Sequence, residues 1–409
     1  NLPIGQMEEK FADYGEVQIK QLNDRSKMYY TPNKENNVFQ LIVQYGAGER
    51  EFPKLGYAAQ LMNNAGIMGA YEPQELKEEL SKLNATCHVT ADEDNLYIIM
   101  EGYEATLPQA CQLLSRQILM PKLDEKQLAR LKGSAMGMRQ QRKDNVSILN
   151  EALRQYMLYG EKSDYIKELT DKEIYELQIS ELTGDINRAS NYEAKVFFTG
   201  TLPFDQVYDI LSKNLPLVAN ERPSNSPQAK EMMPVTENTV YFLPNNDAEQ
   251  AQIHLYIPMQ KADKKDDVLR SAFNQYFGLD FTGIVLNEIR EKRSMAYTAY
   301  AFVGTQGIAG KASYLRGYIG TQNDKANDAL DVLMSLVNDM PKNPERIGNI
   351  KSYLRQAMLT SHPSFRNKAM ELVDLGYRGY TDDPAKENLP KVDALTFDDI
   401  VKFYEENIK

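Results

Sequence analysis

A six-residue pattern stands at Val240-Tyr241-Phe242-Leu243-Pro244-Asn245 and, 241 − 29 = 212 residues earlier, at Met28-Tyr29-Tyr30-Thr31-Pro32-Asn33. Each copy is typical of an apolar and aromatic strand that leaves into a turn. A second pair follows at a similar offset, because Ile253-His254-Leu255-Tyr256-Ile257 matches Phe39-Gln40-Leu41-Ile42-Val43 after 253 − 39 = 214 residues. The helices and strands predicted beyond these pairs also come in the same order, which indicates two copies of one unit.

The two copies determine the expected fold class and domain boundaries. Residues 217–234 hold proline, serine, asparagine and charged residues without periodicity, as is typical of a linker. We therefore expect an α+β fold of two homologous domains, each a mixed β-sheet packed on one face by helices. The first repeat would span residues 1–216, and the second repeat would span residues 235–409.

The composition excludes several classes of protein. A formal net charge of -11 over 409 residues argues against a nucleic-acid groove or an anionic membrane surface as the partner. No apolar run approaches the roughly 18 residues of a membrane-spanning helix. The two cysteines, Cys87 and Cys111, exclude a disulfide framework and leave the location open, with the bacterial periplasm or cell envelope among the alternatives. The start at Asn1 fits a fragment or a mature form.

The chain offers no histidine pair for a metal site. Its three histidines, His88, His254 and His362, are far apart in the sequence, so no two of them share a helical turn. A Gly-x-Ser-x-Gly nucleophile elbow is also absent from the sequence. We expect no zinc site in this chain; the alternative is a site assembled from distant ligands.

A charged helix end runs into an aromatic strand between Leu286 and Tyr300. Such a corner would bring Arg290, on the last helical turn, close to Tyr297, at the start of the strand. Arg290 is a permanent cation with several N–H donors, and Tyr297 is a phenol that can donate to a developing oxyanion. Packing and solvation at the corner are the alternative interpretation of this pair.

Three features together resemble the pitrilysin/insulinase zinc peptidases, also called inverzincins. The first is Tyr45-Gly46-Ala47-Gly48-Glu49-Arg50-Glu51, which is similar to the family's glycine-containing exit from its second strand. The second is the repeat of α+β units, each of roughly 200 residues. The third is Arg290-Glu291-Lys292-Arg293-Ser294-Met295-Ala296-Tyr297, similar to the family's Arg-Glu-x-x-Gly-Leu-Ala-Tyr. It departs from that motif at Ser294, where glycine is usual, and at Met295, where leucine is usual.

The resemblance implies a zinc helix in the first repeat, but the zinc ligands are missing from it. When Gly56 and Ala58 are aligned with the family motif, its two histidines and its glutamate fall on Ala59, Asn63 and Met62. Ala59 has no ligand atom, Asn63 is a poor zinc ligand, and Met62 cannot act as the general base that activates water. We therefore expect a degenerate zinc helix, and neither a metal nor another cofactor in this chain.

For Arg290 and Tyr297 the resemblance implies contacts with substrate: Arg290 with peptide carbonyl groups, and Tyr297 with the tetrahedral intermediate. The chain would be the non-catalytic half of a zinc-dependent endopeptidase, inactive alone, that encloses a peptide together with its partner. Zinc would lie in an N-terminal half or in a partner subunit of the same family. The alternatives are a structural or assembly role, or a peptide-binding module without peptidase activity.

Overall fold

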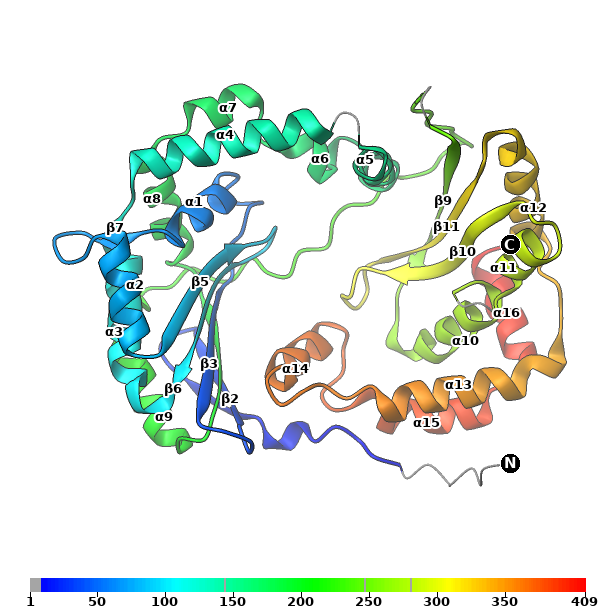
Figure 1. Ribbon diagram of the computed structural model, residues 1–409. Coiled ribbons are helices and arrows are strands. Elements are labelled where there is room, and N and C mark those ends of the chain that lie inside the picture. Colours follow the sequence, from blue (N-terminus) through cyan, green and yellow to red (C-terminus); the bar gives the residue numbers. More distant parts are fainter. Residues whose placement is uncertain (1–8, 143–144, 246–247, 280–281) are drawn as a thin grey trace.

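The computed structural model describes residues 9–142, 145–245, 248–279 and 282–409. Figure 1 shows two units, each with its sheet toward the middle of the molecule and most of its helices outside. Each unit has its own hydrophobic core. The α+β class expected from the sequence is confirmed. The division into a first repeat (1–216), a linker (217–234) and a second repeat (235–409) stays a prediction.

The first unit is built on a six-stranded sheet in the order β1-β2-β8-β3-β6-β5. This sheet is mixed, because β2 and β8 run parallel whereas the other neighbours are antiparallel. Its strands are β1 (Gln18–Gln21), β2 (Lys27–Pro32), β3 (Val38–Tyr45), β5 (Ala85–Ala91), β6 (Leu96–Tyr103) and β8 (Ala194–Gly200), and two short strands, β4 (Gly66–Ile67) and β7 (Pro121–Lys122), pair separately. Its helices are α1 (Leu55–Met62), α2 (Pro73–Lys82), α3 (Leu107–Leu119), α4 (Glu125–Arg142), α5 (Val146–Tyr159), α6 (Asp164–Lys167), α7 (Asp171–Glu176), α8 (Ile179–Ala189) and α9 (Phe204–Asn214).

The second unit repeats part of this plan. Its sheet has three antiparallel strands in the order β10-β11-β9, namely β9 (Gln250–Lys261), β10 (Ala296–Thr305) and β11 (Ala312–Gln322). Its helices are α10 (Asp267–Phe277), α11 (Ile284–Leu286), α12 (Ala326–Asn338), α13 (Ile347–Thr360), α14 (Lys368–Tyr377), α15 (Pro384–Ala394) and α16 (Phe397–Asn407). Within the described ranges, no helix of either unit combines the length and the apolar character needed to cross a membrane.

One predicted strand is wrong. Residues 240–245, which revealed the repeat, form neither helix nor strand. Val240 is 88% exposed and Phe242 is 83% exposed, whereas their counterparts Met28 and Tyr30 lie buried in β2. In the first unit β2 pairs with β8, and the second sheet has no described strand in the place of β8. A strand needs a neighbour to satisfy its backbone groups, so the pattern alone does not form one.

Each unit places one helix against the sheet of the other unit. α14 packs on the first sheet, where Ala369 joins the buried cluster of Val17, Ile42 and Phe197. α5 packs on the second sheet, where the His254 Nε2 lies 2.7 Å from the Asn150 Oδ1. Figure 1 shows both helices in the middle of the molecule, so the units are held together by reciprocal helix contacts.

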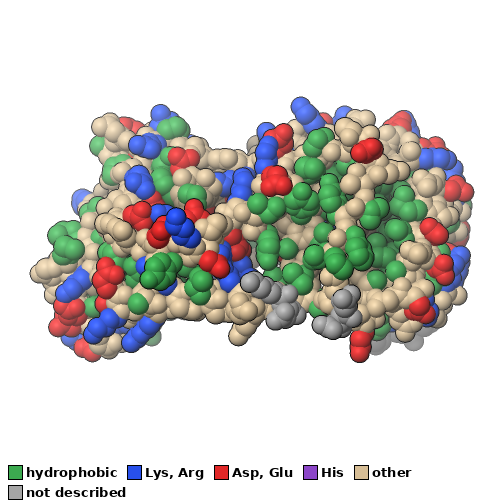
Figure 2. Space-filling view, turned by 90° about the horizontal axis from the view of Figure 1, so that it is seen from above, with side chains coloured by type: hydrophobic (Ala, Val, Ile, Leu, Met, Phe, Trp, Pro, Cys, Tyr) green, Lys and Arg blue, Asp and Glu red, His purple; other side chains and the backbone are tan. Residues whose placement is uncertain are grey.

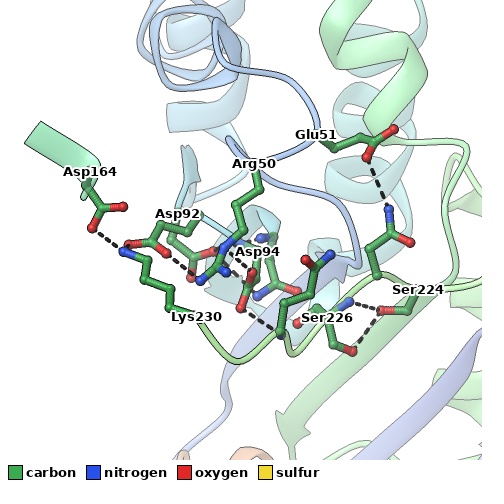
Figure 3. Close-up of polar contacts among 12 residues, drawn as sticks. Arg50, Glu51, Asp92, Asp94, Asp164, Ser224, Ser226 and Lys230 are labelled. Atoms are coloured by element: carbon green, nitrogen blue, oxygen red, sulfur yellow. Dashed lines mark hydrogen bonds and ion pairs between the residues drawn. The ribbon is translucent and has the colours of Figure 1, made fainter. Parts of the chain in front are cut away.

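The segment between the units is fixed to the first unit by polar contacts (Figure 3). Lys230 donates to Glu93 over 2.6 Å and also pairs with Asp164 of α6. The backbone N–H of Asn225 donates to the Gly46 carbonyl over 2.8 Å. A Cβ at Gly46 would lie 2.8 Å from the Ser224 Cα, so the glycine-containing exit from β3 lets this segment approach closely.

Candidate functional site

The corner that carries Arg290 is formed by a π-helical turn. Residues Asn287–Glu291 follow α11 in this conformation, and the Lys292 N–H donates to the Asn287 carbonyl five residues earlier over 3.0 Å. The turn ends at Ser294, whose φ of 49° lies in the left-handed region. Left-handed backbone favours glycine, which explains why the family motif has glycine where this chain has serine. β10 begins two residues later, so the turn ends abruptly and the chain enters the strand at once.

Arg290 and Tyr297 meet across this corner as the sequence predicted. The Arg290 guanidinium carbon lies 5.1 Å from the centre of the Tyr297 ring, which is a cation–π contact. The Arg290 side chain is 35% exposed and pairs with Glu291 over 3.4 Å. Tyr297 is 77% exposed, so its phenol faces solvent. Both side chains are therefore accessible to a molecule that approaches the corner.

The pair borders a pocket of about 300 Å³. The pocket is lined by Gly278, Leu279, Leu286, Arg290, Tyr297, Thr298, Ala299 and Tyr300. Lys292 and Arg293 both bind Glu288, and their hydrogen bonds lower the pKa of its carboxyl group. Glu291 pairs with Arg290, so the charges of Glu288, Glu291, Lys292 and Arg293 around Arg290 sum to zero. Arg290 is thus a cation beside a largely apolar wall, suited to donate hydrogen bonds to carbonyl oxygens.

The degenerate zinc helix is α1, and the structure gives its residues other roles. Ala59 and Met62 are buried in the core of the first unit. The Asn63 side chain donates to the Val89 carbonyl over 2.9 Å and accepts from the Val89 N–H over 2.8 Å. This two-way contact joins the end of α1 to β5 and occupies both functional groups of the amide. The three residues do not fit a zinc ion, and among the described residues no group of three or more His, Cys, Asp or Glu could hold a metal.

The same amide contact occurs in the second unit, which sequence reasoning missed. Asn274 of α10 donates to the Val303 carbonyl over 3.0 Å and accepts from the Val303 N–H over 2.7 Å. The offsets from the first unit, 274 − 63 = 211 and 303 − 89 = 214, agree with those of the strand patterns. The repeated asparagine was therefore a readable signal of the repeat. It indicates that Asn63 has a structural role at the position of a family zinc ligand.

A protein-family model and several solved structures are similar to this chain. Residues 190–351 match the family model described as "Peptidase M16 inactive domain". The peptidase M16 inactive domain from Pseudomonas fluorescens has a similar structure, with a TM-score of 0.71 and 17% identity over 96% of this chain and 95% of that one. A comparison with curated protein sequences finds no match.

Two further solved structures are longer proteins. The ferredoxin protease FusC, solved in complex with Arabidopsis ferredoxin, gives a TM-score of 0.74 and 12% identity, with 97% of this chain matched to 44% of that one. The periplasmic protease PqqL from Escherichia coli gives a TM-score of 0.69 and 13% identity, with 98% of this chain matched to 45% of that one. The chain thus spans less than half the length of either protease.

Proposed function

We propose that this chain, which belongs to the zinc-less side of the pitrilysin family, is the non-catalytic half of a zinc-dependent endopeptidase. In this proposal it supplies Arg290 and Tyr297 to a peptide-binding chamber whose zinc lies on an N-terminal half or a partner subunit. Zinc would provide the activated water there, and this chain would bind the peptide and stabilise the charge that develops on it.

The proposal rests on the placement of Arg290 and Tyr297. Both side chains reach one pocket from a corner whose other charges neutralise one another. A peptide presents carbonyl oxygens, and the guanidinium can bind one of them through its N–H groups. The Tyr297 hydroxyl can donate to the oxyanion of the tetrahedral intermediate, and a well-placed donor of this kind lowers the barrier by roughly 3–4 kcal/mol.

The partner and the substrate follow from the same proposal. The partner would be a zinc-bearing M16 half, because α1 of this chain lacks every zinc ligand. FusC and PqqL, which are proteases about twice as long as this chain, support a machine made of two such halves. The substrate would be a peptide or an unfolded protein segment, and a periplasmic location, as described for PqqL, would be compatible with this role.

Reconstitution tests this proposal. The chain would be mixed with a zinc-bearing M16 half from the same genome, and cleavage of an unstructured peptide would be followed alongside zinc content. We expect no zinc and no cleavage from the chain alone, cleavage by the mixture, and a loss of about tenfold or more with Arg290→Ala. Lys292→Ala is the matched control, because Lys292 lies on the same turn but pairs with Glu288.

Two outcomes would contradict the proposal. If the zinc-bearing half cleaves as fast without this chain, the chain contributes nothing to catalysis. If Arg290→Ala cleaves as fast as the native chain, the pair has only a packing role. Either result would favour a structural or assembly protein, whereas peptide binding without cleavage by the mixture would favour a peptide-binding module.

A further inference from the structure

The first unit contains a pocket that the proposed function does not use. Its volume is about 640 Å³, more than twice that of the pocket beside Arg290 and Tyr297. Ligand pockets in proteins commonly have volumes of roughly 300–1,000 Å³. The end of α1, helix α2 and the strands β5 and β6 supply most of its lining. We call it the α2–β5 pocket.

The α2–β5 pocket lies at a corner that both units share. In the described part of the chain, Asn84 and Ser294 are the two residues other than glycine with a positive φ, and for both the angle is 49°. Asn84 lies between α2 and β5, and Ser294 lies between the π-helical turn and β10. β5 and β10 are each an edge strand of their sheet. Both pockets therefore lie where a helical turn leads into an edge strand.

The offset between the two corners also relates the residues that line the two pockets. It is 294 − 84 = 210 residues, and Leu286 likewise follows Leu76 by 210 residues. Arg290 follows Leu80 by the same number, and these two pairs all line the pocket of their own unit. The first unit thus has leucine at the position of Arg290. Its pocket can hold a side chain, but this position supplies no cation to a peptide carbonyl.

The buried lining of the α2–β5 pocket is apolar. Met62, at the position of the family's general base, lines the pocket together with Val89, and both are buried. Burial raises the pKa of the Cys87 thiol to about 12, so this lining group is uncharged at neutral pH. The charged lining residues Lys77 and Glu101 are exposed. Such a lining favours an apolar group and rejects a charged one.

The sheet edge beside the pocket offers backbone groups to an extended polypeptide. Asn63 binds both the N–H and the C=O of Val89, so these two groups point away from β6. Backbone groups alternate in direction along an antiparallel strand, so those of Ala85 and Cys87 point the same way. Both residues line the pocket. Since the Asn63 amide occupies the edge at Val89, the free stretch is short.

We propose that the α2–β5 pocket is a second peptide-binding site, which takes one uncharged apolar side chain of a short extended segment. The apolar lining holds the side chain, and the backbone of Ala85 and Cys87 holds the segment. The site binds peptide without acting on it, because Leu80 stands in the place of Arg290. That this peptide is a peptidase substrate rests on the proposed function. The binding itself uses neither Arg290 nor Tyr297, so the two proposals can fail separately.

Photo-crosslinking of the whole chain tests the proposal. The probe is a blocked octapeptide of glycine and serine with one central photo-leucine, and mass spectrometry would locate the crosslinked residues. We expect crosslinks within residues 76–89, and an excess of the same peptide with ordinary leucine should suppress them. The same peptide with aspartate should compete about tenfold less well or worse, because burying a leucine side chain contributes roughly 1.5–3 kcal/mol.

Two substitutions on α2 show whether the crosslinks arise inside the pocket. Ser81→Trp places a large ring at an exposed position of the lining and should reduce crosslinking by about tenfold or more. Glu78→Trp is the matched control, since Glu78 is exposed on the same helix but does not line the pocket. Arg290→Ala should leave the crosslinks in residues 76–89 unchanged, which separates this site from the one that carries the proposed function.

The hydrophobic surface of the second unit needs a control of its own. Figure 2 shows hydrophobic side chains gathered on that unit when the molecule is seen from above. An apolar probe can adhere to such a surface. Phe242→Ser should reduce crosslinks there, because Phe242 is exposed, and should leave those in residues 76–89 unchanged.

Any of four results would overturn the proposal. An absence of crosslinks in residues 76–89 at millimolar peptide would show that the pocket takes no peptide. Unchanged crosslinking of Ser81→Trp would place the bound peptide outside the pocket. Equal competition by the leucine and aspartate peptides would show that the pocket does not select an apolar side chain. Suppression by octanoate at a lower concentration than by the leucine peptide would identify a site for a free aliphatic acid.

Discussion

β3 and β9 occupy corresponding positions in the two units, yet they differ in what surrounds them. β3 is paired on both edges and its core-facing side chains are fully buried, whereas β9, among the described residues, is paired on one edge and its core-facing side chains are only partly buried. Both strands carry apolar residues at alternate positions. The comparison shows that burial is set by the neighbours of a strand as much as by its own sequence.

The two units share one local contact between a helix and its adjacent strand. The amide contact between helix and strand is the same at Asn63 and Val89 as at Asn274 and Val303, with all four distances between 2.7 and 3.0 Å. This contact needs only one helix and one adjacent strand. It is therefore retained in a unit whose described residues form no strand on the outer side of β9.

The largest expected difference between the units is in the effect of replacing Leu41 of β3 and Leu255 of β9. Leu41→Ala would leave a cavity in a closed core and should lower the free energy of unfolding by about 3 kcal/mol. Leu255→Ala should cost about 1 kcal/mol, because solvent already reaches that side chain. Urea unfolding of both variants measures the difference. Equal losses would show that the two cores are equally closed.

The next largest expected losses of stability come from replacing Asn63 or Asn274. Asn63→Ala and Asn274→Ala each remove two hydrogen bonds and leave a strand N–H and C=O without a partner, so each should cost about 1–3 kcal/mol. Because the contact is the same in both units, the two costs should be similar, as thermal or urea unfolding would show. Asn64→Ala is the control: the Asn64 side chain accepts a hydrogen bond from the exposed Lys77, so its loss should cost less than about 0.5 kcal/mol. If Asn63→Ala lowered the free energy of unfolding no more than Asn64→Ala, the result would show that Asn63 has no structural role.

A pH effect should arise where α5 meets β9. Burial, together with Arg316 and Arg154, lowers the pKa of His254 to about 4, against the weaker opposing effect of Glu151. The unfolded chain therefore binds a proton at higher pH than the folded chain. The contribution of neutral His254 is fully present above about pH 6.5 and is lost as the pH falls toward 4. Since His254 is partly exposed, we expect a loss of about 1–2 kcal/mol between pH 7 and 4.5.

His254→Gln isolates this contribution from the titration of carboxylates elsewhere. The variant keeps a polar group near Asn150 but does not titrate, so its free energy of unfolding should fall less than that of the native chain between pH 7 and 4.5. Chemical unfolding at the two pH values measures both. Identical pH dependences would show that protonation of His254 does not weaken the contact between the units.

The smallest expected effect concerns the corner of the second unit. Ser294→Gly should raise the free energy of unfolding by up to about 1 kcal/mol, because glycine adopts the left-handed backbone at φ 49° without the strain imposed by a side chain. Thermal unfolding would show a higher midpoint. A decrease would mean that the Ser294 side chain contributes more than its backbone costs.

The sequence predicted the elements whose patterns are local. The paired patterns at residues 39–43 and 253–257 lie within β3 and β9. The pairing of Arg290 with Tyr297 was also predicted, because a short corner limits where the two side chains can lie. The strand at 240–245 failed because it depended on a neighbour that the sequence pattern cannot reveal. The π-helical turn was missed because one extra residue in a turn leaves little trace in periodicity.

The kinetic effect of Tyr297→Phe in the reconstituted peptidase tests the central claim most directly. The substitution removes one hydroxyl group from an exposed side chain, so the fold should be unaffected. We predict a fall of about 10²-fold in kcat/KM with little change in KM, because the lost donor acts on the transition state. Tyr175→Phe, at a residue 78% exposed on α7, is the matched control and should cleave like the native chain. An unchanged kcat/KM for Tyr297→Phe would contradict the claim that this chain stabilises the transition state.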